Sequence, residues 1–165
     1  MDASVIRDLV AVLGREDVLT ESTELRTCEC DGLTGYRVVP ALVALPRSAA
    51  EVAATVAVCA RHGIPFVARG AGPGLSGGTL PVADGVVISL QRLRRVLDVD
   101  PVNRRAVVEP GVTNRDISRA AAPYGLYYAP DPCQPESWSG CCPGPRPSRR
   151  WWPADFSAVA AAGRR

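Results

Sequence analysis

Residues 69–78 read RGAGPGLSGG, and five of these ten residues are glycine. A backbone without Cβ atoms can adopt positive φ and lets a ligand come close to the main chain. Successive amides in such a turn can point inward together and form an anion-binding nest. We therefore expect this stretch, called the glycine loop below, to bind a diphosphate.

The residues before the glycine loop predict a strand, a helix and a second strand. Residues 41–45 form a short apolar run, Ser48 caps a helix with Glu51 three residues on, and the helix ends at residues 62–63. Residues 64–68 read as the next strand. This order predicts a βαβ unit with a parallel strand pair and a right-handed crossover. Ligands of such units gather at the carboxyl ends of the strands, where the glycine loop begins.

Other periodic stretches flank this unit on both sides. In chain order they predict an amphipathic helix over 4–13 ended by Gly14, a polar irregular stretch over 19–34, a buried strand over 85–90, a hairpin over 96–109 with its turn at 101–104, a helix capped by Thr113 with Asp116 as box partner, and a strand over 126–128.

Composition narrows the class of protein. The 165 residues suffice for one compact domain. All nineteen basic residues are arginine, but the net charge is only +2. A charge this small does not indicate a protein that binds polyanions. The chain opens without a secretory pattern and contains no run long enough to span a bilayer, which predicts a cytoplasmic protein with thiols rather than disulfides. The six cysteines form no paired knuckles, and we expect no metal site.

Three kinds of phosphate-binding loop are compatible with a glycine-rich segment. A P-loop needs a lysine, and the chain has none. Gly72, Gly74 and Gly77 match the Rossmann spacing G-x-G-x-x-G, but that motif requires a helix to start within the loop, and here a strand pattern follows. The sequence favours the third kind, a loop that wraps a diphosphate with backbone amides alone.

Several spaced motifs carry a family resemblance. They are the glycine loop, PVADGVVISL at 81–90, VVEPGVTN at 107–114, GLYYAPDP at 125–132, ECDGL at 29–33 and the ALVALPRS segment. Together they resemble the FAD-binding domain of the p-cresol methylhydroxylase/vanillyl-alcohol oxidase type. The resemblance is greatest to the flavin subunit of glycolate oxidase and to FAD-linked D-lactate and D-2-hydroxyacid dehydrogenases.

The resemblance implies a fold and a set of cofactor contacts. The implied fold class is α/β (α+β): the N-terminal subdomain of a PCMH-type FAD-binding domain, with a βαβ unit, a small mixed sheet and a glycine-rich diphosphate loop. The implied FAD-binding residues are Arg69, Gly70, Ala71, Gly72, Gly74, Leu75, Ser76, Gly77 and Gly78 at the diphosphate, Pro110, Gly111 and Val112 near the adenosine, and Pro130, Asp131 and Pro132 along the flavin.

Two details qualify the cofactor site. Pro73 stands where family members commonly have a small polar residue, and proline lacks an amide hydrogen, so one potential phosphate donor is absent. Parts of the superfamily attach flavin through histidine, but His62, the only histidine, ends a helix away from the loop. We therefore expect non-covalent FAD, with His62 structural or facing solvent.

The composition changes after Pro132. Residues 133–165 contain all three tryptophans and half of the cysteines, with no helical or strand period before residues 158–162. This predicts a boundary between residues 1–132, the N-terminal part of the FAD-binding domain, and 133–165, a segment that is disordered or read out of frame. A rival interpretation is a single-stranded nucleic-acid contact by Arg146, Arg149, Arg150, Trp151 and Trp152, but we expect no nucleic-acid partner.

The resemblance implies an FAD-linked oxidoreductase that oxidises a 2-hydroxy acid of the glycolate or D-lactate type. No residue of the chain is assigned as the catalytic base, and the family's second FAD subdomain and substrate cap are not recognisable. We therefore expect a truncated chain that is inactive alone. The alternative is a non-catalytic nucleotide-binding remnant, or a subunit completed by partner chains.

Overall fold

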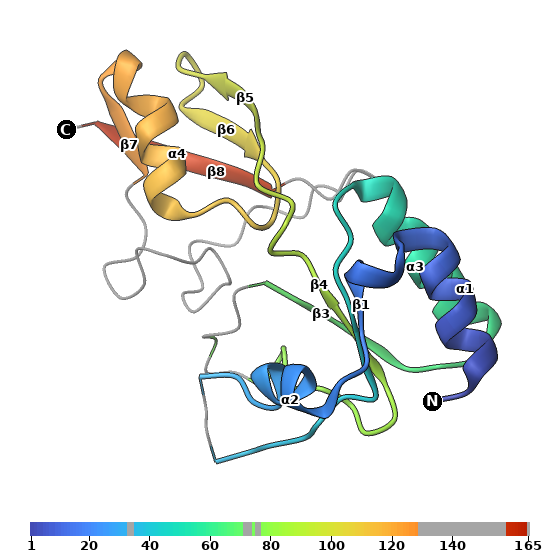
Figure 1. Cartoon of the computed structure of the whole chain (residues 1–165). Coiled ribbons are helices and arrows are strands. Elements are labelled where there is room, and N and C mark those ends of the chain that lie inside the picture. Colours follow the sequence, from blue (N-terminus) through green and yellow to red (C-terminus); the bar gives the residue numbers. More distant parts are fainter. Residues whose placement is uncertain (33–34, 71–73, 75–76, 129–157, 165) are drawn as a thin grey trace. The chain divides into compact units, whose positions relative to one another are not determined.

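The structure is a computed structural model that describes residues 1–32, 35–70, 74, 77–128 and 158–164 (Figure 1). It divides into two compact units, Met1–Arg92 and Leu93–Arg165, and each unit is described by itself. The described helices include none that is long and apolar enough to cross a membrane.

The first unit is built on a four-stranded mixed sheet in the order β1-β2-β4-β3. Its strands are β1 (Val18–Leu19), β2 (Leu42–Ala44), β3 (Phe66–Arg69) and β4 (Val86–Ser89). β2, β4 and β3 run parallel, and β1 joins β2 antiparallel. The predicted small mixed sheet is confirmed, but β2 and β3 are not neighbours, because β4 lies between them.

Helices cover both faces of this sheet. α1 (Ala3–Leu13) and α3 (Ala49–Arg61) lie side by side on one face (Figure 1). The other face is covered by the short helix α2 (Ser22–Leu25), which continues into a 3-10 turn, η2 (Arg26–Cys28). Leu25 of α2 packs on Val43 and Val87 of the sheet. All four residues of the central strand β4 are buried, as the apolar run predicts for a strand covered on both faces.

The helix ends follow the sequence signals closely. The Ser48 hydroxyl accepts a hydrogen bond from the Glu51 amide, and Gly63 takes a positive φ of 64° just beyond α3. The Glu51 carboxylate reaches the Arg47 amide at 2.7 Å, one residue before the cap. The sequence predicts an irregular stretch over 19–34, but the structure has the short helix α2 within it. The side chain of Leu25 is buried against the sheet and stabilises this helix.

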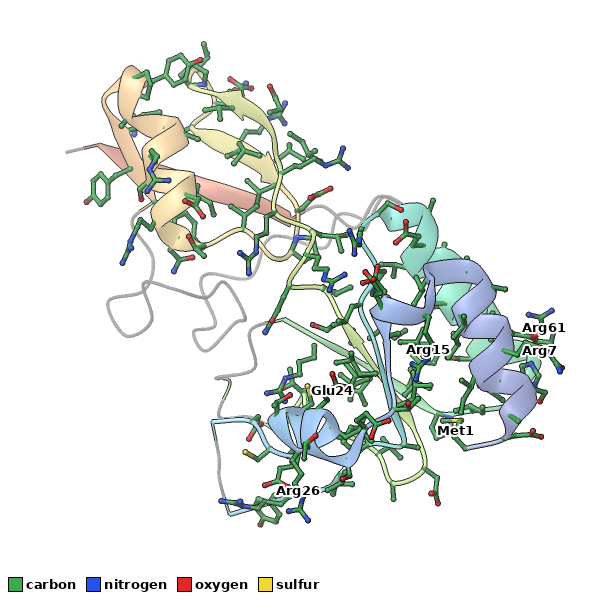
Figure 2. The ribbon with its side chains drawn as sticks, in the orientation of Figure 1. Met1, Arg7, Arg15, Glu24, Arg26 and Arg61 are labelled. Carbon is green, nitrogen blue, oxygen red and sulfur yellow. The ribbon has the colours of Figure 1, made fainter. Side chains whose placement is uncertain are left out.

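His62 has a defined partner. Its Nε2 lies 2.9 Å from Asp8 Oδ2, and Arg61 lies 3.5 Å from the same oxygen. The hydrogen bond from His62 is the main cause that lowers the pKa of Asp8. Arg61 and Arg7 point away from the sheet beside this pair (Figure 2). The histidine therefore links α3 to α1, which agrees with the structural role that is one of the two expectations from the sequence.

The second unit combines a helix with an antiparallel sheet in the order β5-β6-β8-β7. Its elements are β5 (Val96–Asp100), β6 (Arg105–Val108), α4 (Asn114–Ala121), the 3-10 turn η3 (Ala122–Tyr124), β7 (Leu126–Tyr128) and β8 (Ala158–Arg164). The first unit contains one further 3-10 turn, η1 (Arg15–Asp17), directly before β1. The hairpin and the Thr113 cap of α4 are confirmed, and Ala106, Val108, Val112 and Ile117 form the core.

Strand β8 comes from the segment that the sequence separates from the domain. Its backbone pairs with β6 on one side and β7 on the other, both antiparallel. It contains residues 158–162, the one part of that segment in which the sequence shows a period. Residues 133–157 lie outside the described part of the chain, and the division of the chain at Pro132 stays a prediction.

Acid is expected to weaken the first unit through Asp17. Hydrogen bonds from Arg47 and then Arg92 hold the pKa of this buried carboxyl below its ordinary value of 3.8. A group with a lowered folded pKa stabilises the fold above its unfolded pKa, and that contribution is lost as the pH falls through the folded value. Urea unfolding from neutral pH to about pH 3 should therefore show a steeper loss of stability below about pH 4 for the wild type than for Asp17→Asn. Parallel curves would contradict the assignment.

Candidate functional site

The glycine loop starts at the carboxyl edge of the parallel strands. Arg69 is the last residue of β3, and its carbonyl accepts a hydrogen bond from the Leu90 amide at 2.8 Å. The Gln91 side chain donates to the Gly70 carbonyl at 3.2 Å. The residues that follow β4 thus hold the first turn of the loop where a parallel sheet places its ligands.

A second segment supports the loop from residues 28–32, called the brace below. The Gly32 amide donates to the Gly74 carbonyl at 2.9 Å. From the opposite direction, the buried Arg69 side chain donates through Nη1 to the Cys30 carbonyl at 2.7 Å. The brace is therefore bound both to the end of β3 and to the middle of the loop.

Gly77 takes the conformation that requires glycine. Its φ is +72°, in the left-handed region that L side chains rarely adopt. Its amide donates to Asp31 Oδ2 at 3.0 Å, and its carbonyl accepts from the Leu80 amide at 3.2 Å. In this conformation the Gly77 amide donates its hydrogen bond to the Asp31 carboxylate of the protein itself. The assignment of Gly77 to the cofactor site stays a prediction.

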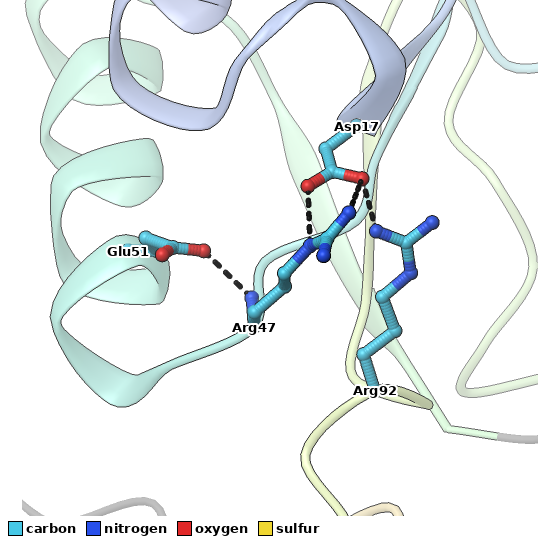
Figure 3. Close-up of polar contacts among 4 residues, drawn as sticks. All are labelled: Asp17, Arg47, Glu51 and Arg92. Atoms are coloured by element: carbon cyan, nitrogen blue, oxygen red, sulfur yellow. Dashed lines mark hydrogen bonds and ion pairs between the residues drawn. The ribbon is translucent and has the colours of Figure 1, made fainter.

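An ion-pair cluster lies at the same carboxyl edge. Asp17 is almost fully buried and accepts from Arg47 Nε at 2.7 Å, and it also pairs with Arg92 (Figure 3). Arg47 follows β2 and Arg92 follows β4. One buried carboxylate therefore ties the segments after two parallel strands to the start of β1.

The predicted adenosine segment lies in the second unit, just after β6. Glu109 is buried and accepts from both the amide and the side chain of Arg95, at 2.7 and 2.8 Å. The Gly111 amide donates to the Leu93 carbonyl at 2.8 Å, and the Val112 side chain belongs to the core. The amides of Gly111 and Val112 already have hydrogen-bond partners within the unit, the carbonyls of Leu93 and Glu109.

The structure describes part of the predicted site. Described in the first unit are Arg69, Gly70, Gly74, Gly77 and Gly78; described in the second are Pro110, Gly111 and Val112. Outside the described residues lie Ala71, Gly72, Pro73, Leu75, Ser76, Pro130, Asp131 and Pro132, together with Arg146, Arg149, Arg150, Trp151 and Trp152. The loop residues of the first unit come together at one edge of its sheet.

Sequence reasoning missed two residues beside the loop. Asp31 belongs to the motif ECDGL, which contributes to the resemblance, but it is not among the predicted cofactor residues. Thr79 follows the loop directly, and its Oγ1 is buried without a hydrogen-bond partner among the described residues. A threonine after a glycine run gives no signal of burial, so only the structure could identify it.

Titratable side chains of the described part form no metal centre. No group of three or more His, Cys, Asp or Glu side chains that could hold a metal ion occurs among these residues. The described cysteines, Cys28, Cys30 and Cys59, are free thiols, and burial raises the pKa of Cys59. What the described site can do is bind: it presents backbone groups and a hydroxyl around a glycine turn.

Comparison with known proteins agrees with a binding site of this kind. The profile of the family described as "FAD binding domain" matches residues 40–139. The glycolate oxidase subunit GlcD of Escherichia coli K12 is 52% identical over 116 residues, covering 70% of this chain and 23% of that protein. The D-lactate dehydrogenase of Anaerostipes hadrus is 37% identical over 93 residues, covering 56% of this chain and 20% of that protein.

Solved structures share the fold. The crystal structure of p-cresol methylhydroxylase with substrate bound matches 74% of this chain and 25% of that chain, with a TM-score of 0.65 and 24% identity. This likeness concerns the fold alone. The chain spans about a quarter of the length of the curated relatives it matches.

Proposed function

The chain belongs to the FAD-binding domain family, and from that membership we propose that its glycine loop binds the diphosphate of non-covalently held FAD. The enzyme we propose is an FAD-linked oxidoreductase that oxidises a 2-hydroxy acid of the glycolate or D-lactate type. The observation that carries the proposal is the position of the loop, at the carboxyl edge of three parallel strands and bound on both sides by the segments around it.

The residues at the loop fit a diphosphate. Gly77 makes the left-handed turn, and a Cβ built on Gly78 would meet nothing within 4 Å, which leaves space beside the backbone. The buried Thr79 hydroxyl has no partner among the described residues, and a buried hydroxyl without a hydrogen bond is costly. A phosphate or ribityl oxygen supplies the missing partner.

The substrate class rests on the relatives. Proteins named glycolate oxidase subunit and D-lactate dehydrogenase match 70% and 56% of this chain, and both names denote oxidation of a 2-hydroxy acid. When bound, FAD supplies the hydride acceptor for such a reaction. The part of this chain is to bind and orient the cofactor through the glycine loop and residues 110–112, and we assign no proton transfer to any of its described residues.

Ligand-induced stabilisation tests the binding proposal. A ligand that binds only the folded state raises the melting temperature, and the rise grows with the logarithm of the ligand concentration relative to its dissociation constant. We expect FAD and ADP to raise the melting temperature of the purified chain, because both carry the diphosphate. Riboflavin, which lacks it, should have little effect. Equal effects of all three compounds, or none from FAD, would contradict a diphosphate site.

Thr79→Val should separate stability from cofactor affinity. Valine keeps the shape of threonine and removes the buried hydroxyl, so the unliganded protein should gain up to about 1 kcal/mol in its free energy of unfolding. FAD affinity should fall about tenfold, since the proposed hydrogen bond to a phosphate or ribityl oxygen is lost. Titration by flavin fluorescence, with Thr79→Ser as the control that keeps the hydroxyl, measures the effect. Unchanged affinity in Thr79→Val would remove this residue from the site.

The 165 residues by themselves are proposed to bind without turning over substrate. Oxidation needs a base for the hydroxyl proton, and no described residue of the chain is assigned that role. Because the matched GlcD proteins are named as subunits, we further propose that activity requires additional chain or partner subunits. Reduction of a dye acceptor by the purified chain with glycolate or D-lactate would overturn this proposal.

The division of the chain at Pro132 also remains a proposal. The family profile continues to residue 139, slightly beyond that position. We propose that the Arg-, Pro- and Trp-rich segment 133–165 departs from the family through a frameshift in a GC-rich coding sequence. Translating the coding DNA in its other two frames tests this, and no family-like continuation in either frame would exclude it.

A further inference from the structure

A buried carboxylate beneath a phosphate-binding loop is unexpected, because like charges repel. Asp31 is only 5% exposed, and its Oδ2 accepts the Gly77 amide at 3.0 Å. Gly77 belongs to the loop that we propose to hold a diphosphate. The hydrogen bond to Gly77 gives Asp31 a contribution other than attraction for the ligand.

The geometry around Asp31 indicates what that contribution is. On one side of it, the Cys30 carbonyl accepts from Arg69 at 2.7 Å, which fixes the brace to the end of β3. On the other side, the Gly32 amide donates to the Gly74 carbonyl at 2.9 Å. Asp31 is thus held between two anchored neighbours and has little freedom to move away from the loop.

The hydrogen bond reaches the loop at Gly77, whose backbone conformation favours glycine. Gly77 has φ of +72°, and its carbonyl also accepts the Leu80 amide, so the residue is bound on both its amide and its carbonyl side. A glycine-rich segment loses much conformational entropy when it becomes ordered. Fixing one glycine before the ligand arrives lowers the entropy that binding must overcome.

We propose that Asp31 is a positioning residue that fixes Gly77 of the glycine loop for FAD diphosphate binding by accepting the Gly77 amide. The inference rests on the proposed function. It requires the acceptor oxygen and its position, and it does not require the negative charge. The charge opposes the diphosphate, so an uncharged acceptor in the same place serves at least as well.

Three substitutions at one position distinguish this role from a merely structural one. Asp31→Asn keeps an acceptor oxygen in place and removes the charge, so FAD affinity should equal or exceed that of the wild type. Asp31→Glu keeps the charge but displaces the oxygen by one methylene, and Asp31→Ala removes it. Both should weaken FAD binding about tenfold. Asp98→Ala, which removes an exposed carboxylate from β5, is the matched control and should bind FAD as the wild type does.

Equilibrium titration of the full chain with FAD, followed by flavin fluorescence, gives the affinities. Amide hydrogen exchange without FAD gives a second measure, since the Gly77 amide should exchange faster in Asp31→Glu than in Asp31→Asn. If Asp31→Ala fails to fold, the comparison of the Asn and Glu variants decides the matter alone. Equal affinities of Asp31→Glu and wild type would overturn the positioning role and leave FAD binding intact, whereas no binding by the wild type would overturn both proposals.

Discussion

The double variant Arg47→Met/Arg92→Met should lose about 3 kcal/mol of its free energy of unfolding, because it leaves the buried Asp17 carboxylate without a cation. Asp17 is 4% exposed, while Arg47 and Arg92 are more exposed and would be hydrated if released. The cost therefore falls on the carboxylate. Methionine keeps an apolar stem like that of arginine over Asp17. The loss of unfolding free energy is therefore due to the missing positive charges and not to lost packing over the carboxylate.

Adding Asp17→Asn to this double variant provides the control. A neutral amide costs less to bury than an unpaired carboxylate, so the triple variant should recover a large part of the lost stability in urea unfolding. Because Arg47 and Arg92 follow β2 and β4 at the edge where the glycine loop begins, FAD affinity should fall and recover in parallel. A triple variant less stable than the double variant would contradict this account of the cluster.

Gly85→Ala should destabilise the first unit by about 3 kcal/mol, although Gly85 has no positive φ. An ideal Cβ at this position would lie 2.9 Å from the Pro65 carbonyl oxygen and 3.0 Å from the Val82 carbonyl oxygen. Both are backbone atoms that cannot rotate away. The residue immediately precedes β4, so the required shift enters the centre of the parallel sheet.

Gly35→Ala is the matched control for this substitution. A Cβ on Gly35 meets nothing within 4 Å, and its φ is not positive, so stability should change by less than about 0.5 kcal/mol. Thermal or urea unfolding of both variants measures the difference. Equal stability of Gly85→Ala and Gly35→Ala would show that the backbone around Gly85 accommodates a side chain.

Local signals in the sequence predicted the elements well. The Ser48 and Thr113 caps, the hairpin over 96–109 and the buried strand over 85–90 each depend on residues close in sequence, and the structure confirms them. The family resemblance is also confirmed, by the profile match and by the identity to GlcD. Caps, turns and alternation are properties of a few consecutive residues and can be read without knowing the fold.

Contacts between distant residues could not be predicted in the same way. The insertion of β4 between β2 and β3 depends on which strands pair, and the apolar patterns of these strands are alike. Asp31 reaches Gly77 across 46 residues, and Asp17 reaches Arg92 across 75. An aspartate before a glycine reads as a turn in any sequence, so its contact with the loop becomes visible only when both segments are placed.

The central claim is that the glycine loop of this chain binds the FAD diphosphate. Equilibrium dialysis of FAD against the purified chain, with excess ADP added to a parallel sample, tests it most directly. We predict a higher flavin absorbance on the protein side that disappears when ADP is present, since ADP occupies the same diphosphate site. Equal flavin absorbance on both sides of the membrane without ADP would contradict the account.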